Sequence, residues 1–216
     1  LLPEAKGGAL TGALLVALAG LALLFNCYYN LTTMAVARRE ERMLYRLTAG
    51  EVSRFELLVA MASPHALLAL VQVILGALLL GRTVGGAEWA NMQVALVGFL
   101  GGAAICSMLA FAVSGRTRSV EAAQLTTMPV LLGAGILGGV FAPLHVFSEK
   151  LAQIGQFSPL APTVDLVRLG IAGIGPDGVP AAVEGATLGR PLLVLLGWLV
   201  LGTFLGRRFM RWDVRQ

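Results

Sequence analysis

The chain has 216 residues, of which 57% are hydrophobic and 13% are charged, about half the charged fraction of an ordinary soluble domain. Uncharged apolar stretches of about 20 residues recur along its whole length, which excludes a soluble domain with a single anchor. The net charge of +4 comes mostly from arginines at the ends of these stretches. That placement fits a lipid surface and membrane orientation better than nucleic acid.

Five apolar runs predict membrane spans, and each should be an α-helix because backbone in lipid must satisfy its own hydrogen bonds. The runs cover residues 7–37, 57–81, 89–115, 122–148 and 191–206. We therefore predict an all-α integral membrane protein, a polytopic helical bundle in which residues 1–216 form a single domain. Gly98 and Gly102, four residues apart, are spaced for close helix packing.

Basic residues fall unequally on the two sides of such a bundle. If the spans alternate, eleven of the 16 Lys and Arg residues lie on one side and five on the other. The positive-inside rule then places the C-terminal tail in the cytoplasm and Leu1 outside. An external start at a residue other than Met predicts a further helix upstream, so we expect six spans in the full protein.

The sequence carries few signs of chemistry of its own. It contains no phosphate-binding loop, no H-E-x-x-H and no G-x-S-x-G, so we expect no ATP site, no metal site and no enzyme activity. Cys27 and Cys106 lie inside apolar runs without ligand spacing and are predicted to be buried hydrophobic residues. Asp, Glu, Lys and Arg are absent from the first four apolar runs, unlike in most proton- or sodium-coupled carriers.

Amide and hydroxyl side chains are the polar groups that remain inside the spans. Asn26, Asn30 and Gln72 are three of them. Side chains of this kind usually form hydrogen bonds between neighbouring helices. The alternative is that they line a path for a substrate with polar groups.

Residues 38–56 join the first two spans on the predicted cytoplasmic side. Arginines one turn apart lie on one helical face and apolar residues on another, as in a helix that lies along the membrane or fits a groove on a partner. Ser53 and Glu56 have the spacing of a capping box at the start of the next helix. A connection that only sets topology is the other interpretation.

Residues 143–191 are predicted to lie outside and to differ from the rest of the chain. They are moderately apolar but rich in Pro and Gly, which break helices. Short helical pieces are expected at residues 154–157 and 164–171. We interpret the segment as a pair of half-inserted or surface-lying helices that cap the outer mouth.

Three stretches resemble the permease subunit of ABC exporters of the type-2 family, in particular the daunorubicin-resistance-like branch. Residues 38–56 are similar to that family's R-E-x-G-T-L-E-x-L loop before P-x-S-x-x-E, although Met43 and Leu44 replace its Gly-Thr. Residues 138–144 are similar to its S-G-x-x-F-P motif, and residues 157–168 to its external Pro…Arg motif.

The resemblance implies the permease subunit of an ATP-driven exporter in the bacterial plasma (inner) membrane, with no cofactor. ATP would be hydrolysed by a separate nucleotide-binding subunit, and a second permease, identical or not, would complete a dimer. The cargo would be amphipathic or lipid-like: a drug, polyketide, lipid or glycan. The coupling residues implied are Arg42, Leu44, Arg46, Leu47, Glu51 and Arg54. The external gate residues implied are Phe141, Pro143, Pro159, Pro162 and Arg168.

Two other functions stay open on the sequence. A haem-export-type permease of cytochrome c maturation has a similar size and topology. A membrane scaffold or assembly factor that transports nothing is the alternative from another class. Co-purification with an ATPase subunit separates the exporter from the scaffold.

Overall fold

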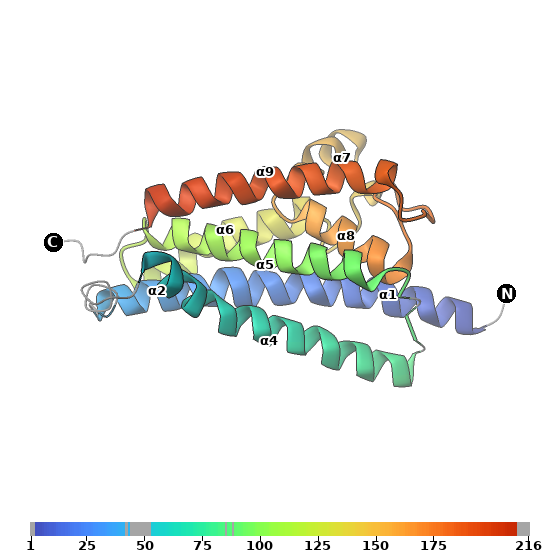
Figure 1. Cartoon of the computed structure of the whole chain (residues 1–216), viewed down its shortest axis with the longest axis horizontal. Coiled ribbons are helices and arrows are strands. Elements are labelled where there is room, and N and C mark those ends of the chain that lie inside the picture. The colour runs from blue at the N-terminus through green and yellow to red at the C-terminus, as the bar shows by residue number, and fades with distance from the viewer. Residues whose placement is uncertain (1–2, 42, 44–52, 85, 88, 211–216) are drawn as a thin grey trace.

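The protein is an all-helical bundle in a computed structural model that describes residues 3–41, 43, 53–84, 86–87 and 89–210. Among these residues, five helices are long and apolar enough to cross a membrane, which confirms the predicted number of spans. They lie side by side along the long axis of the molecule, with α4 and α9 on opposite flanks (Figure 1). The described part of the chain contains no β-strand, only one isolated bridge between Ile174 and Pro180.

The first span is one long helical rod made of three consecutive pieces. The α-helix α1 (Pro3–Ala22) continues into the π-helix η1 (Leu23–Asn30) and then into α2 (Leu31–Glu40). A π-helical turn widens the helix and is frequent at functional sites. The apolar pattern predicted the rod, but nothing in it indicated the change of helical pitch at Leu23.

The other four spans begin and end at capping residues that charge-free runs do not reveal. They are α4 (Arg54–Thr83), α5 (Met92–Ser114), α6 (Val120–Leu137) and α9 (Gly185–Phe209). The predicted fourth span, residues 122–148, was too long, because the chain leaves the helix at Gly138 and turns at Gly139 with a φ of 72°. The predicted fifth span was too short, because α9 begins six residues before Pro191 and includes Arg190.

Residues 138–184 form a helical hairpin at one end of the bundle. The hairpin contains η2 (Leu144–Val146), α7 (Glu149–Gly155) and α8 (Ala161–Ala172). The piece predicted at residues 164–171 lies within α8, while the piece predicted at 154–157 lies across the end of α7. All residues of α8 from Ala161 to Ile171 are buried, so α8 is packed inside the bundle and not on its surface.

Glycines allow α8 to lie directly against α5. A Cβ on Gly98 would lie 2.7 Å from the Leu166 side chain, and a Cβ on Gly102 would collide with Thr163. From the other side, Gly170 of α8 faces the backbone of Ala95. The predicted close packing at Gly98 and Gly102 therefore exists, and its partner is α8.

The core lies along the first span and α5. In each of these two spans 56% of the apolar stretch is buried inside the protein, against 17% in α4 and in α9. α4, α6 and α9 expose apolar side chains along most of their length, as expected for helices that face lipid or another subunit. The bundle thus consists of two central spans, three peripheral spans and the buried helix α8.

Candidate coupling and gate sites

Arginine residues gather at one end of the bundle, which we call the arginine-rich end. This end contains the end of α2, the start of α4, the α5–α6 connection and the end of α9 (Figure 1). Its described basic residues are Arg38, Arg39, Arg54, Arg116, Arg118, Arg207 and Arg208. The opposite end, which we call the re-entrant end, contains the hairpin of residues 138–184 and holds Arg82, Lys150, Arg168 and Arg190. The spans therefore alternate, as the count of basic residues on the two sides assumed.

Most of the predicted coupling residues lie outside the described residues: Arg42, Leu44, Arg46, Leu47 and Glu51. Arg54 is described, and it is the exposed first residue of α4. The predicted capping box is confirmed directly before it. The Ser53 hydroxyl accepts the Glu56 backbone N–H at 3.2 Å, and the Glu56 carboxylate accepts the Ser53 backbone N–H at 2.9 Å. The start of α4 is thus fixed where the chain returns from the predicted coupling segment.

Arg39, in the last turn of α2, is buried at the arginine-rich end although the neighbouring Arg38 is exposed. Its guanidinium donates hydrogen bonds to the carbonyl of Ser114 at 2.6 Å and to the carbonyl of Thr117. Ser114 is the last residue of α5. A helix C-terminus carries unpaired carbonyls and a partial negative charge, which a cation stabilises. Arg39 therefore joins the end of α2 to the α5–α6 connection.

The end of α9 packs against the same connection. A Cβ on Gly115 would collide with the backbone carbonyl of Phe209, so only glycine permits this approach. The Arg116 guanidinium lies over the Phe209 ring at 4.1 Å from its centroid, a distance typical of a cation–π contact. As a result, α2, α5, α6 and α9 are tied together at the arginine-rich end.

Four of the five predicted gate residues lie on two turns of the hairpin that meet. Phe141 and Pro143 follow the end of α6, while Pro159 and Pro162 lie at the start of α8. The Ser158 hydroxyl joins these turns by donating to the carbonyl of Leu137 at 3.0 Å. Phe141 is 48% exposed, whereas Pro162 is buried at the start of α8.

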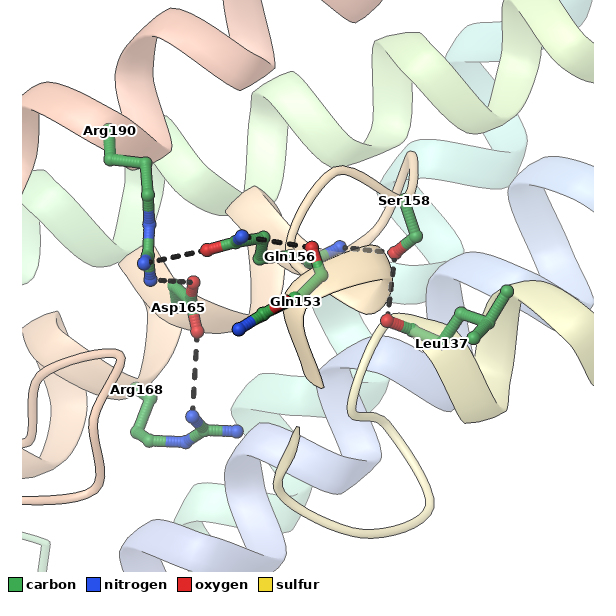
Figure 2. Close-up of polar contacts among 8 residues, drawn as sticks. Leu137, Gln153, Gln156, Ser158, Asp165, Arg168 and Arg190 are labelled. Carbon is green, nitrogen blue, oxygen red and sulfur yellow. Dashed lines mark hydrogen bonds and ion pairs between the residues drawn. The ribbon is translucent and has the colours of Figure 1, made fainter. Parts of the chain in front are cut away.

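Arg168, the fifth predicted gate residue, lies apart from the turns in a charged cluster between α8 and α9 (Figure 2). Its guanidinium pairs with the Asp165 carboxylate at 3.5 Å, and Arg190 of α9 approaches the other oxygen of Asp165 at 3.9 Å. Arg190 also donates to the Gln156 side chain at 2.9 Å. The Trp198 indole N–H of α9 donates to the carbonyl of Phe157 at 2.8 Å. These contacts fasten the hairpin to α9.

Burial controls the electrostatics of this cluster. Desolvation raises the pKa of Asp165 from 3.8 to about 6, because the nearby positive charges of Arg168 and Arg190 only partly offset it and Asp177 adds to it. Burial likewise lowers the pKa of Arg168, and Asp165 opposes that shift. The cluster therefore contains a carboxyl group whose pKa lies above the usual range of an aspartate.

A polar contact at mid-span joins η1 to α4. The Asn26 amide donates to the Gln72 side chain at 2.9 Å and to the carbonyl of Ala22 at 2.9 Å. This confirms an interhelical hydrogen bond for two of the predicted polar residues. The same amides line an open groove of about 660 Å³ between the two helices, together with Asn30. Asn30 and Gln72 are exposed there.

The structure adds residues that sequence reasoning did not single out. Asp165 and Arg190 complete the cluster around Arg168, and the i, i+3 spacing of Asp165 and Arg168 in an apolar segment was the available signal. No sequence signal singled out Arg39, because Arg38 and Arg39 are identical neighbours and only packing decides which one is buried.

The model of the family described as ABC-2 type transporter matches residues 4–171, from α1 to the last turn of α8. The chain belongs to the ABC-2 type transporter family. It is accordingly a multi-pass membrane permease component of an ABC transporter. Neither a curated protein nor a solved structure matches the chain significantly.

Proposed function

We propose that this ABC-2 permease is the membrane subunit of an exporter that uses ATP hydrolysed by a separate subunit. The observation that carries the proposal is the gathering of the end of α2, the start of α4, the α5–α6 connection and the end of α9 at the arginine-rich end. These segments form a single face of the bundle, suited to a partner in the cytoplasm under the positive-inside rule. The segment 38–56 would be the coupling element on that face.

Arg39 supports a mechanical role for this face. A partner that moves residues 42–54 acts on the end of α2, and the hydrogen bonds of Arg39 connect that end to α5 and to the α5–α6 connection. Movement at one connection is therefore passed to a second one by buried contacts. ATP shifts the equilibrium between two permease states only if the partner holds this face differently in each state.

The hairpin at the re-entrant end is the proposed external gate. Phe141, Pro143, Pro159 and Pro162 form its two turns, and Arg168 belongs to the cluster that holds it against α9. An amphipathic or lipid-like cargo is supported by the groove between η1 and α4, where exposed amides interrupt an apolar surface. A second permease copy in a bacterial inner membrane, with the C-terminus in the cytoplasm, completes the proposal.

Co-purification tests the coupling assignment. The tagged permease is isolated from its native membranes, and its companion is identified by retention on ATP-agarose and by ATPase activity. Arg46→Glu and Glu51→Lys are expected to lower recovery of the companion without affecting insertion. Lys150→Glu, a charge reversal of an exposed residue at the re-entrant end, is the matched control. Full recovery with both coupling variants, or the absence of any ATP-binding companion, would refute the proposal.

A further inference from the structure

A second groove opens between α4 and α5 near the re-entrant end. Its rims are exposed side chains, Ile74 and Leu78 on α4 and Met92 and Leu96 on α5. Within each rim the two residues are one helical turn apart, so the groove runs along the helices. It opens toward the side of the bundle, where the same helices expose their apolar faces.

The floor of this groove is formed by the core. Phe99 of α5 and Val167 and Ile171 of α8 lie there, and each is at most 5% exposed. The groove encloses about 380 Å³, within the range of small-molecule sites. All the residues that line it are apolar. An empty space of this size would deprive its walls of dispersion contacts, and water would find no polar partners in it.

A charge and an aromatic ring lie at the outer end of the groove. Arg82 follows Leu78 by four residues, so it lies on the same face of α4, one turn nearer the end of the helix. It is exposed, and it forms no ion pair within the described residues. Trp89 lines the groove at this end, and its backbone N–H donates to the carbonyl of Ile171 at 2.9 Å. Trp and Arg at the end of a span are typical of the headgroup region.

The backbone at Trp89 is held in an unusual conformation. Its φ of 48° is in the left-handed region, which residues other than glycine seldom adopt. The hydrogen bond to Ile171, with that from the Asn91 N–H to the carbonyl of Gly170 at 2.8 Å, fixes the chain there. Such strain persists only where the surroundings impose it, and it is common at ligand clamps.

We propose that this groove binds one acyl chain of an anionic phospholipid, with the phosphate held by Arg82. The apolar lining fits the acyl chain, and the Arg82 guanidinium, which has no ion pair within the described part of the chain, fits the phosphate charge at headgroup depth. The lipid belongs to the leaflet at the re-entrant end and lies against α8. This inference does not depend on the proposed export function.

Photo-labelling of the full chain in phosphatidylcholine nanodiscs tests the site. The probes are phosphatidylglycerol and phosphatidylcholine, each with a diazirine in the acyl chain, added in trace amounts. We expect phosphatidylglycerol to label the rims of the groove about fivefold more than phosphatidylcholine, the preference typical of one basic residue near a membrane surface. Arg82→Gln removes the preference, whereas Lys150→Gln, which changes another exposed cation at the same end, keeps it.

A second pair of variants tests the groove itself. Ala77 lies within it, so Ala77→Phe fills the space and lowers labelling of the rims by both probes. Leu67→Phe, on an exposed part of α4 outside the groove, leaves labelling unchanged. Equal labelling by both lipids, or an Arg82→Gln variant that keeps the preference, overturns the headgroup assignment. Labelling spread evenly over the exposed face of α4 overturns the proposal that the groove binds the acyl chain.

Discussion

The two ends of the bundle each contain a buried arginine, and the two arginines are held in different ways. Arg39 at the arginine-rich end and Arg168 at the re-entrant end are both 8% exposed. Arg39 donates to backbone carbonyls at the end of α5. Arg168 pairs with a carboxylate whose pKa burial raises to about 6. The backbone carbonyls that accept from Arg39 cannot titrate, while the carboxylate that pairs with Arg168 can.

This difference implies different behaviour of the two ends. The hydrogen bonds from Arg39 to the carbonyls of Ser114 and Thr117 involve no group that titrates at physiological pH. The pairing of Arg168 depends on the ionisation of Asp165, which costs free energy because the carboxylate is buried. A fixed junction suits transmission of movement, and a weaker one suits a segment that must move.

The largest expected effect is that of Arg39→Gln. The shorter side chain leaves the carbonyls of Ser114 and Thr117 without their donor, and each buried unsatisfied group costs about 1–3 kcal/mol. We expect a loss of about 3 kcal/mol in the free energy of unfolding, measured by thermal denaturation in detergent. Hydrogen exchange should increase at residues 114–118.

Arg38→Gln is the control for that variant, because it removes the same charge from the adjacent, exposed position. We expect it to change the free energy of unfolding by less than about 0.5 kcal/mol. Equal effects of the two substitutions would show that charge at the end of α2, and not the buried contacts of Arg39, stabilises this junction.

Asp165→Asn addresses the other end. The folded protein binds the Asp165 proton more tightly than the unfolded chain, whose carboxyl has a pKa of 3.8. The free energy of unfolding therefore decreases as the pH rises from about 4 to about 6, by on the order of 2 kcal/mol. Asp165→Asn, which cannot ionise, should lack this component. The difference between the melting profiles of the wild type and Asp165→Asn over this pH range measures it.

Arg39→Gln provides the contrast in the same experiment. Because Arg39 lies at the opposite end of the bundle and its substitution leaves Asp165 and Arg168 in place, the variant should keep the wild-type decrease in stability between about pH 4 and about pH 6 at a lower overall stability. A wild type and an Asp165→Asn variant with parallel melting profiles would mean that Asp165 is solvated, and the distinction between the two ends would be lost.

The sequence was sufficient for the features that depend on local composition. Apolar runs predicted the number of spans, the arginine count under alternating spans predicted which basic residues share an end, and Ser53 with Glu56 predicted the start of α4. Residues 164–171 were also predicted to be helical. These features follow from hydropathy, capping and charge, which are properties of residues close together in the sequence.

Features that depend on packing between distant segments could not be predicted in this way. The burial of α8 depends on glycines of α5 that lie some 60 residues earlier. The selection of Arg39 over Arg38, and the approach of Arg190 to Asp165, depend on how whole helices are placed. The end of α6 was misplaced because Gly138 and Gly139 are as free of charge as the helix before them, so only their backbone conformation shows the turn.

The smallest expected effect is that of Arg190→Gln, and it tests whether the cluster acts as a unit. The Arg190 side chain is 43% exposed and lies 3.9 Å from the Asp165 carboxylate, so its loss should lower the free energy of unfolding by less than about 1 kcal/mol.

The charge of Arg190 nevertheless lowers the pKa of Asp165. Removing it should raise that pKa further, because burial is then opposed by Arg168 alone. The loss of stability should therefore continue to a higher pH. The pH at which the melting profile of the Arg190→Gln protein becomes parallel to that of its Asp165→Asn counterpart should move upward, with little change in stability at about pH 4. Arg207→Gln, which removes a charge from the arginine-rich end, should leave this pH unchanged. A downward shift with Arg190→Gln, or the same shift with Arg207→Gln, would show that net charge rather than the contact across α8 and α9 sets the ionisation of Asp165.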